Sequence, residues 1–501
     1  MNISMILDMA AETFGDRVGV VHGDQRWRYG AIRDAAQRAA QGVADRGAER
    51  LVLLDVSSPA VPVALFAAAY AGVPYVPLNY RLTASEINAL LARVTPALLV
   101  VGDAYADQVE ARDGLQVMRT AEFLALPAAA DAPPPEPAED PAAVAVQLFT
   151  SGTTGQPKAA ILRHENLMAY IVGTVEFASA EEDDAIVVTV PPYHIAGISS
   201  VLSSTYACRR IVQLENFEPA AWLAAVRAES VSNAFLVPTM LARIVEHLEA
   251  HGETVNAPAL RAIAYGGGKM PLPVIRRAMA LFPGVDFTNA YGLTETSSTI
   301  AVLGPDDHRA ALASDDPRVA RRLGSVGRAA AVEIQIRDED GTVLGADEAG
   351  LVFVRGPQVS GEYQTQGSQL DAEGWFPTKD RGYLDDEGYL FLDGRADDVI
   401  VRGGENISPG EIEEVLLSHP AVADVAVVAI PDEQWGEGVA AAVVLKADAA
   451  VDQATLAALV KDRLRSSRVP QRWQFAEALP YNETGKLLRR VIREQFVHVH
   501  A

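Results

Sequence analysis

Hydrophobic residues in the first hundred positions fall into alternating strand-like and helix-like segments. Residues 51–56 are apolar apart from Asp55, residues 63–71 have a helical composition, and residues 73–78 are apolar again after a glycine. This order is typical of a βαβ unit. Residues 97–101 repeat the buried-strand pattern, and strands without a polar side indicate a sheet covered on both faces. The pattern predicts an α/β fold.

The pattern changes near residues 394–398. Beyond them come a helix-like segment, two apolar strands and a second helix, at residues 410–418, 425–430, 439–445 and 454–464. They make an α+β unit of roughly one hundred residues, which is a usual domain size. The proline-rich residues 127–141 are interpreted as a surface loop, because a strand pattern resumes directly after them. We predict domains at residues 1–394 and 399–501, connected by 395–398.

Size and composition support a globular protein of more than one domain. The 501 residues exceed what one hydrophobic core usually organises. Hydrophobic residues make up 49% and charged residues 22% of the chain, an ordinary globular balance. The net charge of −24 disfavours binding to phosphate backbones or anionic lipid. Nucleic acid is therefore not expected as a partner.

The chain shows no signal for export or membrane insertion. Cys208 is the only cysteine, which excludes an intramolecular disulfide and a thiolate metal site and fits a reducing compartment. Residues 1–17 lack a basic start and hold Asp8 and Glu12, so they do not resemble a signal peptide. The longest apolar run, residues 60–76, is interrupted by two prolines and a glycine and is too short to span a bilayer. We expect a cytoplasmic protein without an integral membrane segment.

A loop of glycines and hydroxyl residues follows the apolar strand at residues 144–149. It contains Thr150, Ser151, Gly152, Thr153 and Thr154, and Lys158 stands at its end. Glycines let backbone N–H groups approach an anion, hydroxyls add donors and a lysine adds positive charge, so the loop suits a polyphosphate. The Walker A spacing is absent, which excludes the common nucleotide loop. A flexible Ser/Gly turn is the alternative.

Five segments, in this order, resemble motifs of the acyl-adenylate-forming superfamily, which includes acyl-CoA synthetases, peptide-synthetase adenylation domains and beetle luciferases. They are residues 150–158, 289–295, 375–380, 394–407 and 479–486. The resemblance covers nearly the whole chain. It implies a large N-terminal domain of layered β-sheets and helices, followed by a small mobile C-terminal α+β domain.

The resemblance also implies an ATP and AMP site. It implies that Tyr291 lies near the adenine, that Thr294 contacts the α-phosphate, that Glu295 helps to hold magnesium, that Asp380 binds the ribose, and that Lys486 is the catalytic lysine. The implied catalytic set is Lys486, Thr294, Glu295 and His194. The implied nucleotide set is Thr150, Ser151, Gly152, Thr153, Thr154, Lys158, Gly266, Gly267, Gly268, Asn289, Ala290, Tyr291, Gly292, Thr294, Asp380, Arg395 and Lys486.

The chemistry explains why these residue types suit the task. A carboxylate attacks the α-phosphorus of ATP although both are anions, so the site has to supply positive charge and alignment. Magnesium, Lys486 and the donors of the loop can supply them. Glu295 is the expected metal ligand, because magnesium prefers hard oxygen ligands and takes only one or two from the protein. An exposed carboxylate is the usual fate of a glutamate, but the preceding Gly292-Leu293-Thr294 favours the metal role.

The chain departs from the family pattern at three places. Gly268-Lys269 stands where Ala-Pro is usual after two glycines, Lys379 where a glycine commonly precedes the ribose aspartate, and Ala159-Ala160 where Gly-Val is usual. None of these changes removes a reactive group. They leave the roles of Lys269 and Lys379 unassigned. From the residues alone, the glycine run is either a surface for a flat base or a tight strand-to-helix turn.

Residues 191–198 resemble the segment that lines the acid pocket of the family. His194 has no second histidine, cysteine or aspartate beside it, so it is interpreted as a gate or a neighbour of the carboxylate and not as a metal ligand. The expected pocket is apolar or small-sided, which favours a hydrophobic acid, whether fatty, aromatic or cyclic. Its residues are Tyr193, His194, Ile195, Ala196, Val237, Met240, Gly267 and Ala290.

The C-terminal matches imply a second step. In the family the small domain rotates about a residue matching Asp397. A loop that here holds Arg402, Gly403, Gly404 and Glu405 then lines the CoA side of the site. The expected cofactors and co-substrates are ATP, Mg²⁺ and coenzyme A, and the sequence leaves a homodimer open.

Three other functions compete with an acid–CoA ligase. An adenylation enzyme that loads a carrier protein is the first, but amino-acid-activating relatives place an aspartate in the 193–198 region and this chain has His194 there. A luciferase-like oxygenase shares the first half-reaction. A catalytically silent nucleotide-binding module is disfavoured, because Lys486, Glu295, Asp380 and Arg395 are all retained. We therefore predict an ATP-dependent acid–CoA ligase.

Overall fold

The computed structural model describes residues 1–127, 140–150, 157–482 and 487–498, and these form two compact units. Unit 1 comprises Met1–Glu333 and Val354–Phe376, and unit 2 comprises Ile334–Phe353 and Pro377–Ala501. The connection expected at residues 395–398 thus lies within unit 2. The strand β20 (Phe376–Leu384) pairs antiparallel with β21 (Leu390–Arg395), which ends where the expected connection begins. Both strands, apart from Phe376, belong to unit 2.

Unit 1 contains a nine-stranded sheet with the order β15-β14-β13-β12-β11-β9-β10-β1-β2. The central pairs, from β13 to β1, are parallel, and antiparallel strands complete both edges. The strands are β1 (Val18–His22), β2 (Gln25–Arg28), β9 (Ala185–Val188), β10 (Arg210–Gln213), β11 (Asn233–Leu236), β12 (Ala262–Gly266), β13 (Asp286–Leu293), β14 (Ser298–Leu303) and β15 (Arg328–Ala329).

A second sheet of unit 1 has eight strands in the order β19-β18-β8-β7-β4-β3-β5-β6. The predicted βαβ unit is confirmed, since β3 and β4 are parallel and α3 (Ala60–Ala71) connects them. The strands are β3 (Leu51–Leu54), β4 (Tyr75–Pro77), β5 (Ala97–Val101), β6 (Leu115–Arg119), β7 (Val144–Thr150), β8 (Lys158–Arg163), β18 (Glu362–Tyr363) and β19 (Gly367–Ser368).

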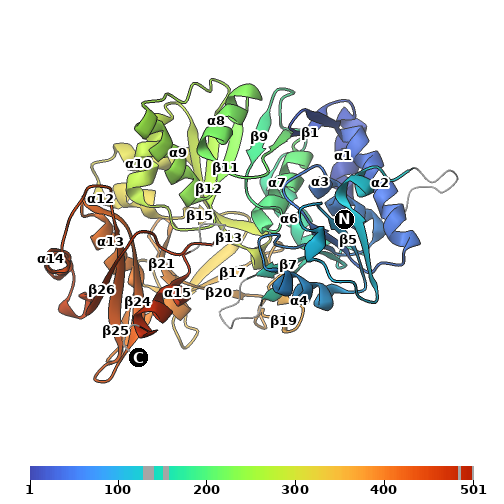
Figure 1. Ribbon diagram of the computed structural model, residues 1–501. Helices are drawn as coiled ribbons and strands as arrows, with labels where there is room; N and C mark the ends of the chain where they lie inside the picture. The colour runs from blue at the N-terminus through green and yellow to red at the C-terminus, as the bar shows by residue number, and fades with distance from the viewer. Residues whose placement is uncertain (128–139, 151–156, 483–486, 499–501) are drawn as a thin grey trace. The chain divides into compact units, whose positions relative to one another are not determined.

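Helices fill the space around these sheets (Figure 1). In unit 1 they are α1 (Ser4–Phe14), α2 (Tyr29–Asp45), α3, α4 (Ala84–Val94), α5 (Thr120–Leu124), α6 (His164–Thr174), α7 (Ile195–Tyr206), α8 (Pro219–Ala228), α9 (Pro238–His251), α10 (Leu272–Leu281), α11 (Pro305–Ala313) and α12 (Pro317–Ala320), with the 3₁₀ turns η1 (Ala106–Gln108), η2 (Thr294–Thr296) and η3 (Arg321–Gly324).

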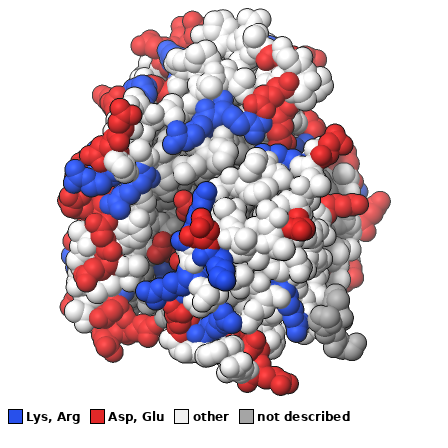
Figure 2. Space-filling view, turned by 90° about the vertical axis from the view of Figure 1, so that its left-hand side faces the viewer, with Lys and Arg blue, Asp and Glu red and all other residues white. Residues whose placement is uncertain are grey.

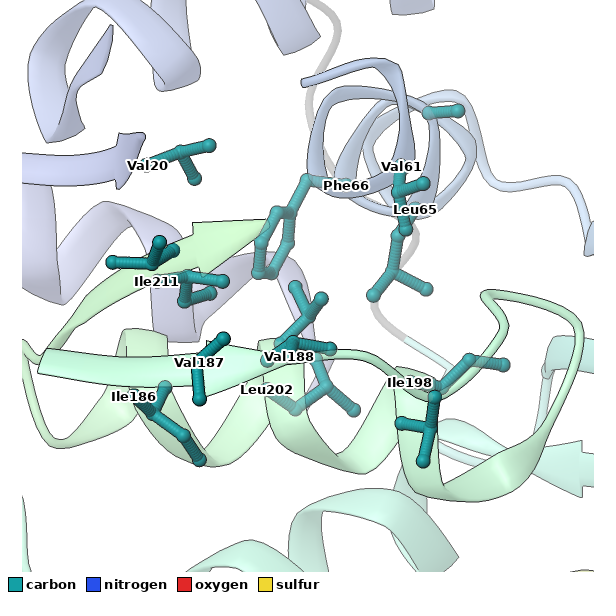
Figure 3. Packing of buried hydrophobic residues seen from close by; sticks show 14 of the residues in the cluster. Val20, Val61, Leu65, Phe66, Ile186, Val187, Val188, Ile198, Leu202 and Ile211 are labelled. Carbon is teal, nitrogen blue, oxygen red and sulfur yellow. The ribbon is translucent and has the colours of Figure 1, made fainter. Parts of the chain in front are cut away.

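One hydrophobic core joins the two sheets of unit 1. The apolar run that contains α3 is a core helix, because all its residues from Ala60 to Tyr70 are buried. Figure 3 shows Leu65 and Phe66 of α3 directed toward Val188 of β9 and Leu202 of α7. In the part of the chain that the structure describes, no helix is both long and apolar enough to cross a bilayer.

Unit 2 holds a five-stranded sheet in which β23-β22-β25-β24 follow one another and β26 pairs with β25. Its elements are β22 (Ile400–Arg402), β23 (Glu405–Ile407), α13 (Pro409–Leu417), β24 (Val422–Asp432), β25 (Gly436–Leu445), α14 (Gln453–Arg463), η5 (Ser466–Arg468), β26 (Arg472–Ala476) and α15 (Arg489–His498). The predicted α+β organisation is confirmed. Both faces of β24 are apolar, because Val425 and Val427 pack with α13 and α14 while Val428 and Ile430 pack with α15.

A four-stranded sheet, β16-β17-β20-β21, completes the architecture. Its first two strands are β16 (Glu333–Arg337) and β17 (Gly350–Arg355), and the short turn η4 (Ala396–Asp398) follows β21 directly. On the face of the molecule in Figure 2, Lys and Arg side chains are interspersed with Asp and Glu side chains, so the positive charge there is compensated locally.

Candidate active site

The predicted phosphate loop connects two paired strands. The register of β7 and β8 places Thr150 opposite Lys158, and the Thr150 hydroxyl lies 3.4 Å from the Lys158 carbonyl oxygen. Ser151, Gly152, Thr153 and Thr154 lie outside the described residues. Pairing of β7 with β8 therefore holds the two ends of the loop together, and Lys158 is the first residue of β8.

Lys158 and Glu295 both contact Tyr363, a residue that the sequence did not point to. The Lys158 ammonium lies 5.4 Å from the centroid of the Tyr363 ring. The Tyr363 hydroxyl donates a hydrogen bond to the Glu295 carboxylate at Oε1. One aromatic side chain thus contacts both the predicted phosphate-binding lysine and the predicted magnesium ligand.

Glu295 is buried, and the segment that holds its side chain through Tyr363 also holds its backbone. Its carbonyl oxygen accepts hydrogen bonds from the N–H groups of Ser360 and Gly361, each at 3.0 Å. The turn that carries Glu295 closes on Thr296, whose hydroxyl accepts from the Leu293 N–H at 3.0 Å. A carboxylate fixed in this way suits magnesium, which takes hard oxygen ligands and needs few from the protein. No group of three or more metal-ligating side chains occurs among residues 1–127, 140–150, 157–482 and 487–498.

Close backbone packing explains two of the predicted glycines. A Cβ on Gly266 would lie 2.2 Å from the Ala290 carbonyl oxygen, and one on Gly292 would lie 1.8 Å from that of Ser298. Gly267 adopts a φ of +83°, a left-handed conformation that favours glycine. Glycines 266 and 292 are therefore required by the strands themselves. Asn289 is buried on β13, where its amide donates to the Ser325 carbonyl at 3.2 Å.

The predicted acid-pocket residues gather at one edge of the nine-stranded sheet. Residues 193–196 follow β9, Val237 and Met240 follow β11, and Gly267 follows β12, at the carboxyl ends of strands where open α/β sheets usually bind ligands. Ala290 lies within β13, opposite Gly266 at the end of β12. Val237 and Met240 are buried at the start of α9, and a Cβ on Gly267 would lie 3.6 Å from Val237. His194, Ile195 and Ala196 begin α7, whose Ser199 hydroxyl lies 3.3 Å from that of Ser298 on β14.

His194 is held uncharged near neutral pH. Burial, followed by the positive charge of Arg81, lowers the pKa of His194 to about 4. Its ring centroid is 4.8 Å from that of Tyr193, and the buried Nε2 has no hydrogen-bond partner among the described residues. A neutral imidazole with an unused nitrogen is available for a hydrogen bond and adds no fixed charge to the pocket.

Unit 2 carries the predicted ribose site. Asp380 and Arg395 are paired across β20 and β21, and the guanidinium donates to Asp380 Oδ1 at 2.9 Å. The Asp380 N–H donates to the Thr378 hydroxyl at 3.1 Å, which fixes the backbone before the carboxylate. Lys379 has a φ of +65°. A glycine, which the family resemblance implies at this position, would adopt that left-handed backbone without strain, and the Lys379 side chain is exposed.

The predicted CoA-side residues form a tight hairpin in unit 2. Gly403 and Gly404 connect β22 and β23, and both have positive φ, as the central residues of a type I′ turn do. The flanking Arg402 and Glu405 are cross-strand partners. Asp397 lies in η4 beside this hairpin in the sequence, and Lys486 lies outside the described residues.

Comparison with known proteins decides the family. A model of the AMP-binding enzyme family matches residues 7–364, and one of the AMP-binding enzyme C-terminal domain matches residues 411–486. The chain belongs to the AMP-binding enzyme family. The predicted resemblance is thereby confirmed.

Individual AMP-binding enzymes agree over almost their whole length. The chain is 32% identical to an indoleacetate–CoA ligase of Aromatoleum aromaticum, covering 92% of this chain and 91% of the relative. It is also 32% identical to a feruloyl-CoA synthase of an Amycolatopsis species, covering 95% of each. The Bacillus subtilis o-succinylbenzoate CoA synthetase, solved with an acyl-adenylate intermediate, superimposes with a TM-score of 0.84 at 29% identity over 97% of each chain. The chain is accordingly an AMP-binding enzyme of the acyl-CoA synthetase branch, as predicted.

Two side-chain contacts of this AMP-binding enzyme, made by Tyr363 and by Tyr80, were not predicted from the sequence. Tyr363 is 68 residues from its partner Glu295, so no local motif contains both. Tyr80 and Arg81 come three and four residues after the end of β4. The Tyr80 ring is 5.5 Å from that of Tyr193, and the Arg81 guanidinium lies 5.6 Å from the Tyr80 ring. Polar residues at the carboxyl end of a buried strand were the available signal for Arg81.

Proposed function

We propose that this AMP-binding enzyme activates a hydrophobic aromatic or cyclic carboxylic acid as an acyl-AMP and transfers the acyl group to CoA. The observation that carries the proposal is the mainly apolar and uncharged character of the predicted pocket residues themselves. Buried Val237 and Met240 and neutral His194 converge at the strand ends, and the eight predicted pocket residues include no carboxylate. The relatives named for indoleacetate and ferulate act on aromatic acids, which supports the same class.

In the first step, this chain's residues bring two anions together. Lys158 and the adjoining loop meet the phosphates, and Lys486 aligns the acid with the α-phosphorus. Glu295 holds the magnesium ion, which supplies charge neutralisation on the phosphate oxygens when it is bound. Asp380 accepts the ribose hydroxyls, with Arg395 fixing the orientation of the carboxylate. His194 donates to or accepts from the substrate without adding charge.

In the second step, CoA attacks the acyl carbon and AMP leaves. The hairpin of Arg402, Gly403, Gly404 and Glu405 lines the thiol side, and a rotation about Asp397 brings this hairpin in as Lys486 moves out. Two facts about the hairpin support a binding role. Trp435 beside it is 44% exposed, and the Arg402 guanidinium lies 5.8 Å from the Trp435 ring. A partly exposed aromatic ring beside a cation suits a large polar co-substrate.

The test is AMP release measured with matched acids and acceptors. Indoleacetate, ferulate and 2-succinylbenzoate represent aromatic and cyclic acids, and a long-chain fatty acid and phenylalanine serve as comparisons. Each is assayed with CoA, with a phosphopantetheinylated carrier protein and with no thiol. We expect CoA-dependent release with at least one aromatic or cyclic acid. Equal or faster release with the carrier protein would favour the adenylation alternative, and release with the fatty acid alone would overturn the substrate class.

A second test separates the half-reactions. Lys486→Ala should lower ATP–pyrophosphate exchange by about 100-fold or more, the scale of removing one charge aligned on a transition state. Transfer from synthetic acyl-AMP to CoA should survive much better. Equal loss of both steps would contradict the assignment of Lys486 to adenylation. The homodimer and the cytoplasmic location stay predictions from the sequence.

A further inference from the structure

We propose that Tyr363 is a positioning residue for adenylation, which orients the Glu295 carboxylate toward magnesium and holds the Lys158 ammonium beside it. This inference rests on the proposed roles of Glu295 and Lys158. Both contacts belong to one side chain, since the hydroxyl donates to Glu295 Oε1 and the ring faces the ammonium at 5.4 Å.

The backbone places Tyr363 where it can act on both groups. Tyr363 on β18 is the cross-strand partner of Ala160, two residues beyond Lys158 on β8. Two and three residues before it, Gly361 and Ser360 donate their N–H groups to the Glu295 carbonyl oxygen. Residues 360–363 therefore hold the backbone and the side chain of Glu295 at once and are paired with the strand that starts at Lys158.

An ion pair fastens this segment to β8. Arg163 donates to both carboxylate oxygens of Glu362, at 3.0 and 2.9 Å. Bidentate arginine–carboxylate pairs fix geometry as well as charge. The pair restrains β18 against β8 one residue from Tyr363, so the tyrosine ring keeps its place relative to Lys158.

The hydrogen bond from Tyr363 gives the two carboxylate oxygens of Glu295 different roles. Oε1 takes the Tyr363 hydroxyl, and Oε2 has no hydrogen bond among the residues that the structure describes. A hydroxyl on one oxygen orients the other for a cation, as outer partners of metal ligands commonly do. The Tyr363 ring attracts the Lys158 ammonium by a cation–π contact. Because the ring carries no net charge, this contact leaves the positive charge of Lys158 unneutralised.

The test compares Tyr363→Phe with Tyr70→Phe. Tyr70 makes the same kind of bond, at 2.5 Å to the Asp8 carboxylate, in a part of the fold far along the chain from the site. Each variant is titrated calorimetrically with a non-hydrolysable ATP analogue, with and without Mg²⁺. For Tyr363→Phe we expect about 10-fold weaker binding of the magnesium complex, the lower end for a lost outer partner of a metal ligand, and unchanged binding without metal. Tyr70→Phe should change neither.

Activity gives an independent measurement. Tyr363→Phe should raise the Mg²⁺ concentration for half-maximal pyrophosphate exchange by about 10-fold and spare transfer from synthetic acyl-AMP. In a variant that already carries Glu295→Gln, adding Tyr363→Phe should not raise the Mg²⁺ requirement further, because Tyr363 acts through Glu295. Tyr363→Leu should additionally weaken metal-free binding, since the ring is lost.

The outcomes decide between the two proposals. Wild-type magnesium affinity in Tyr363→Phe, equal weakening with and without metal, or additive effects with Glu295→Gln would each overturn the positioning role. A wild-type protein that activates no acid would overturn the proposed function, whereas the calorimetric comparison of Tyr363→Phe with Tyr70→Phe would still test Tyr363.

Discussion

Asp380 accepts a hydrogen bond from Arg395 at 2.9 Å across two neighbouring antiparallel strands. The two residues are 15 positions apart, and pairing of β20 with β21 makes them direct neighbours. Asp380 is buried and its exposed side-chain fraction is 9%, so few conformations are open to its carboxylate. The guanidinium fixes Oδ1 and thereby the orientation of the carboxylate that we propose as the ribose ligand.

Asp380→Ala should weaken AMP and ATP binding together, because both share the ribose. Loss of hydrogen bonds to a charged group costs about 1.5–3 kcal/mol, or roughly 10- to 100-fold in affinity. Calorimetry with AMP measures it, and Asp386→Ala, an exposed acid in the turn after β20, is the control. Unchanged AMP affinity in Asp380→Ala would show that the ribose lies elsewhere.

Lys379→Gly should preserve AMP affinity and stabilise the fold slightly. Lys379 has a φ of +65°, and relief of a left-handed backbone in a residue with a Cβ contributes about 1 kcal/mol. Lys379→Val should destabilise by at least as much, because β-branched side chains fit this conformation poorly. Thermal melting and AMP calorimetry together measure both effects. A 10-fold loss of AMP affinity in Lys379→Gly would assign the lysine side chain a binding role.

The sequence predicted the elements whose signals are local. The apolar strands and the helix predicted at residues 63–71, which spans Ala60–Ala71 in the structure, could be identified because burial on all sides leaves continuous hydrophobic runs. Residues 377–394 were assigned to the large domain because pairing of β20 with β21 is not encoded in either strand alone. Tyr363 was missed for the same reason, since its contact with Glu295 forms only when β18 pairs with β8.

The pH dependence of stability should reveal the neutral state of His194. Its pKa in the folded chain is about 4, below the ordinary value of 6.5, so the unfolded chain binds more protons between these values. The stability contributed by His194 is therefore present above pH 6.5 and is lost as pH falls toward 4. His194→Gln removes this group, so its melting temperature should fall less than that of the wild type between pH 7 and 5. Parallel curves would show that folding leaves the pKa of His194 unshifted.

Glu413→Gln should destabilise unit 2 strongly. Glu413 is buried, receives both terminal nitrogens of Arg489, and accepts the Val427 N–H at 2.8 Å. Removal of one charge from a buried pair costs about 3–5 kcal/mol, and we expect the lower end here, because Arg489 loses its bidentate partner but keeps Asp398 at 3.4 Å. Glu494→Gln breaks the exposed pair with Arg490 and should cost less than about 0.5 kcal/mol. Hydrogen exchange of the β24 amides measures both, and equal protection in the two variants would contradict the prediction.

Asp397→Pro tests the two-step mechanism through the turn η4. One site has to surround the triphosphate with Lys486 and later admit a thiol, and a hinge meets both demands by changing backbone dihedral angles at one or two positions. Proline fixes φ near −65° and should restrict that change. Asp397 is the second residue of η4, and proline is tolerated in the first turn of a helix, so the fold should persist.

An ion pair lies on the C-terminal side of the proposed hinge. Asp398, the next residue, lies 3.4 Å from the Arg489 guanidinium, three positions beyond Lys486 in the chain. The end of η4 is thus tied to α15, and rotation would have to occur at or before Asp397. We expect near-normal pyrophosphate exchange and at least about 10-fold slower acyl-CoA formation in Asp397→Pro, whereas Asp397→Ala, which keeps backbone freedom, should support both steps. Acyl-CoA formation at the wild-type rate in Asp397→Pro would exclude the hinge at this position. Equal loss of both steps, with circular dichroism unchanged, would mean that Asp397 also serves adenylation and would contradict a role confined to rotation.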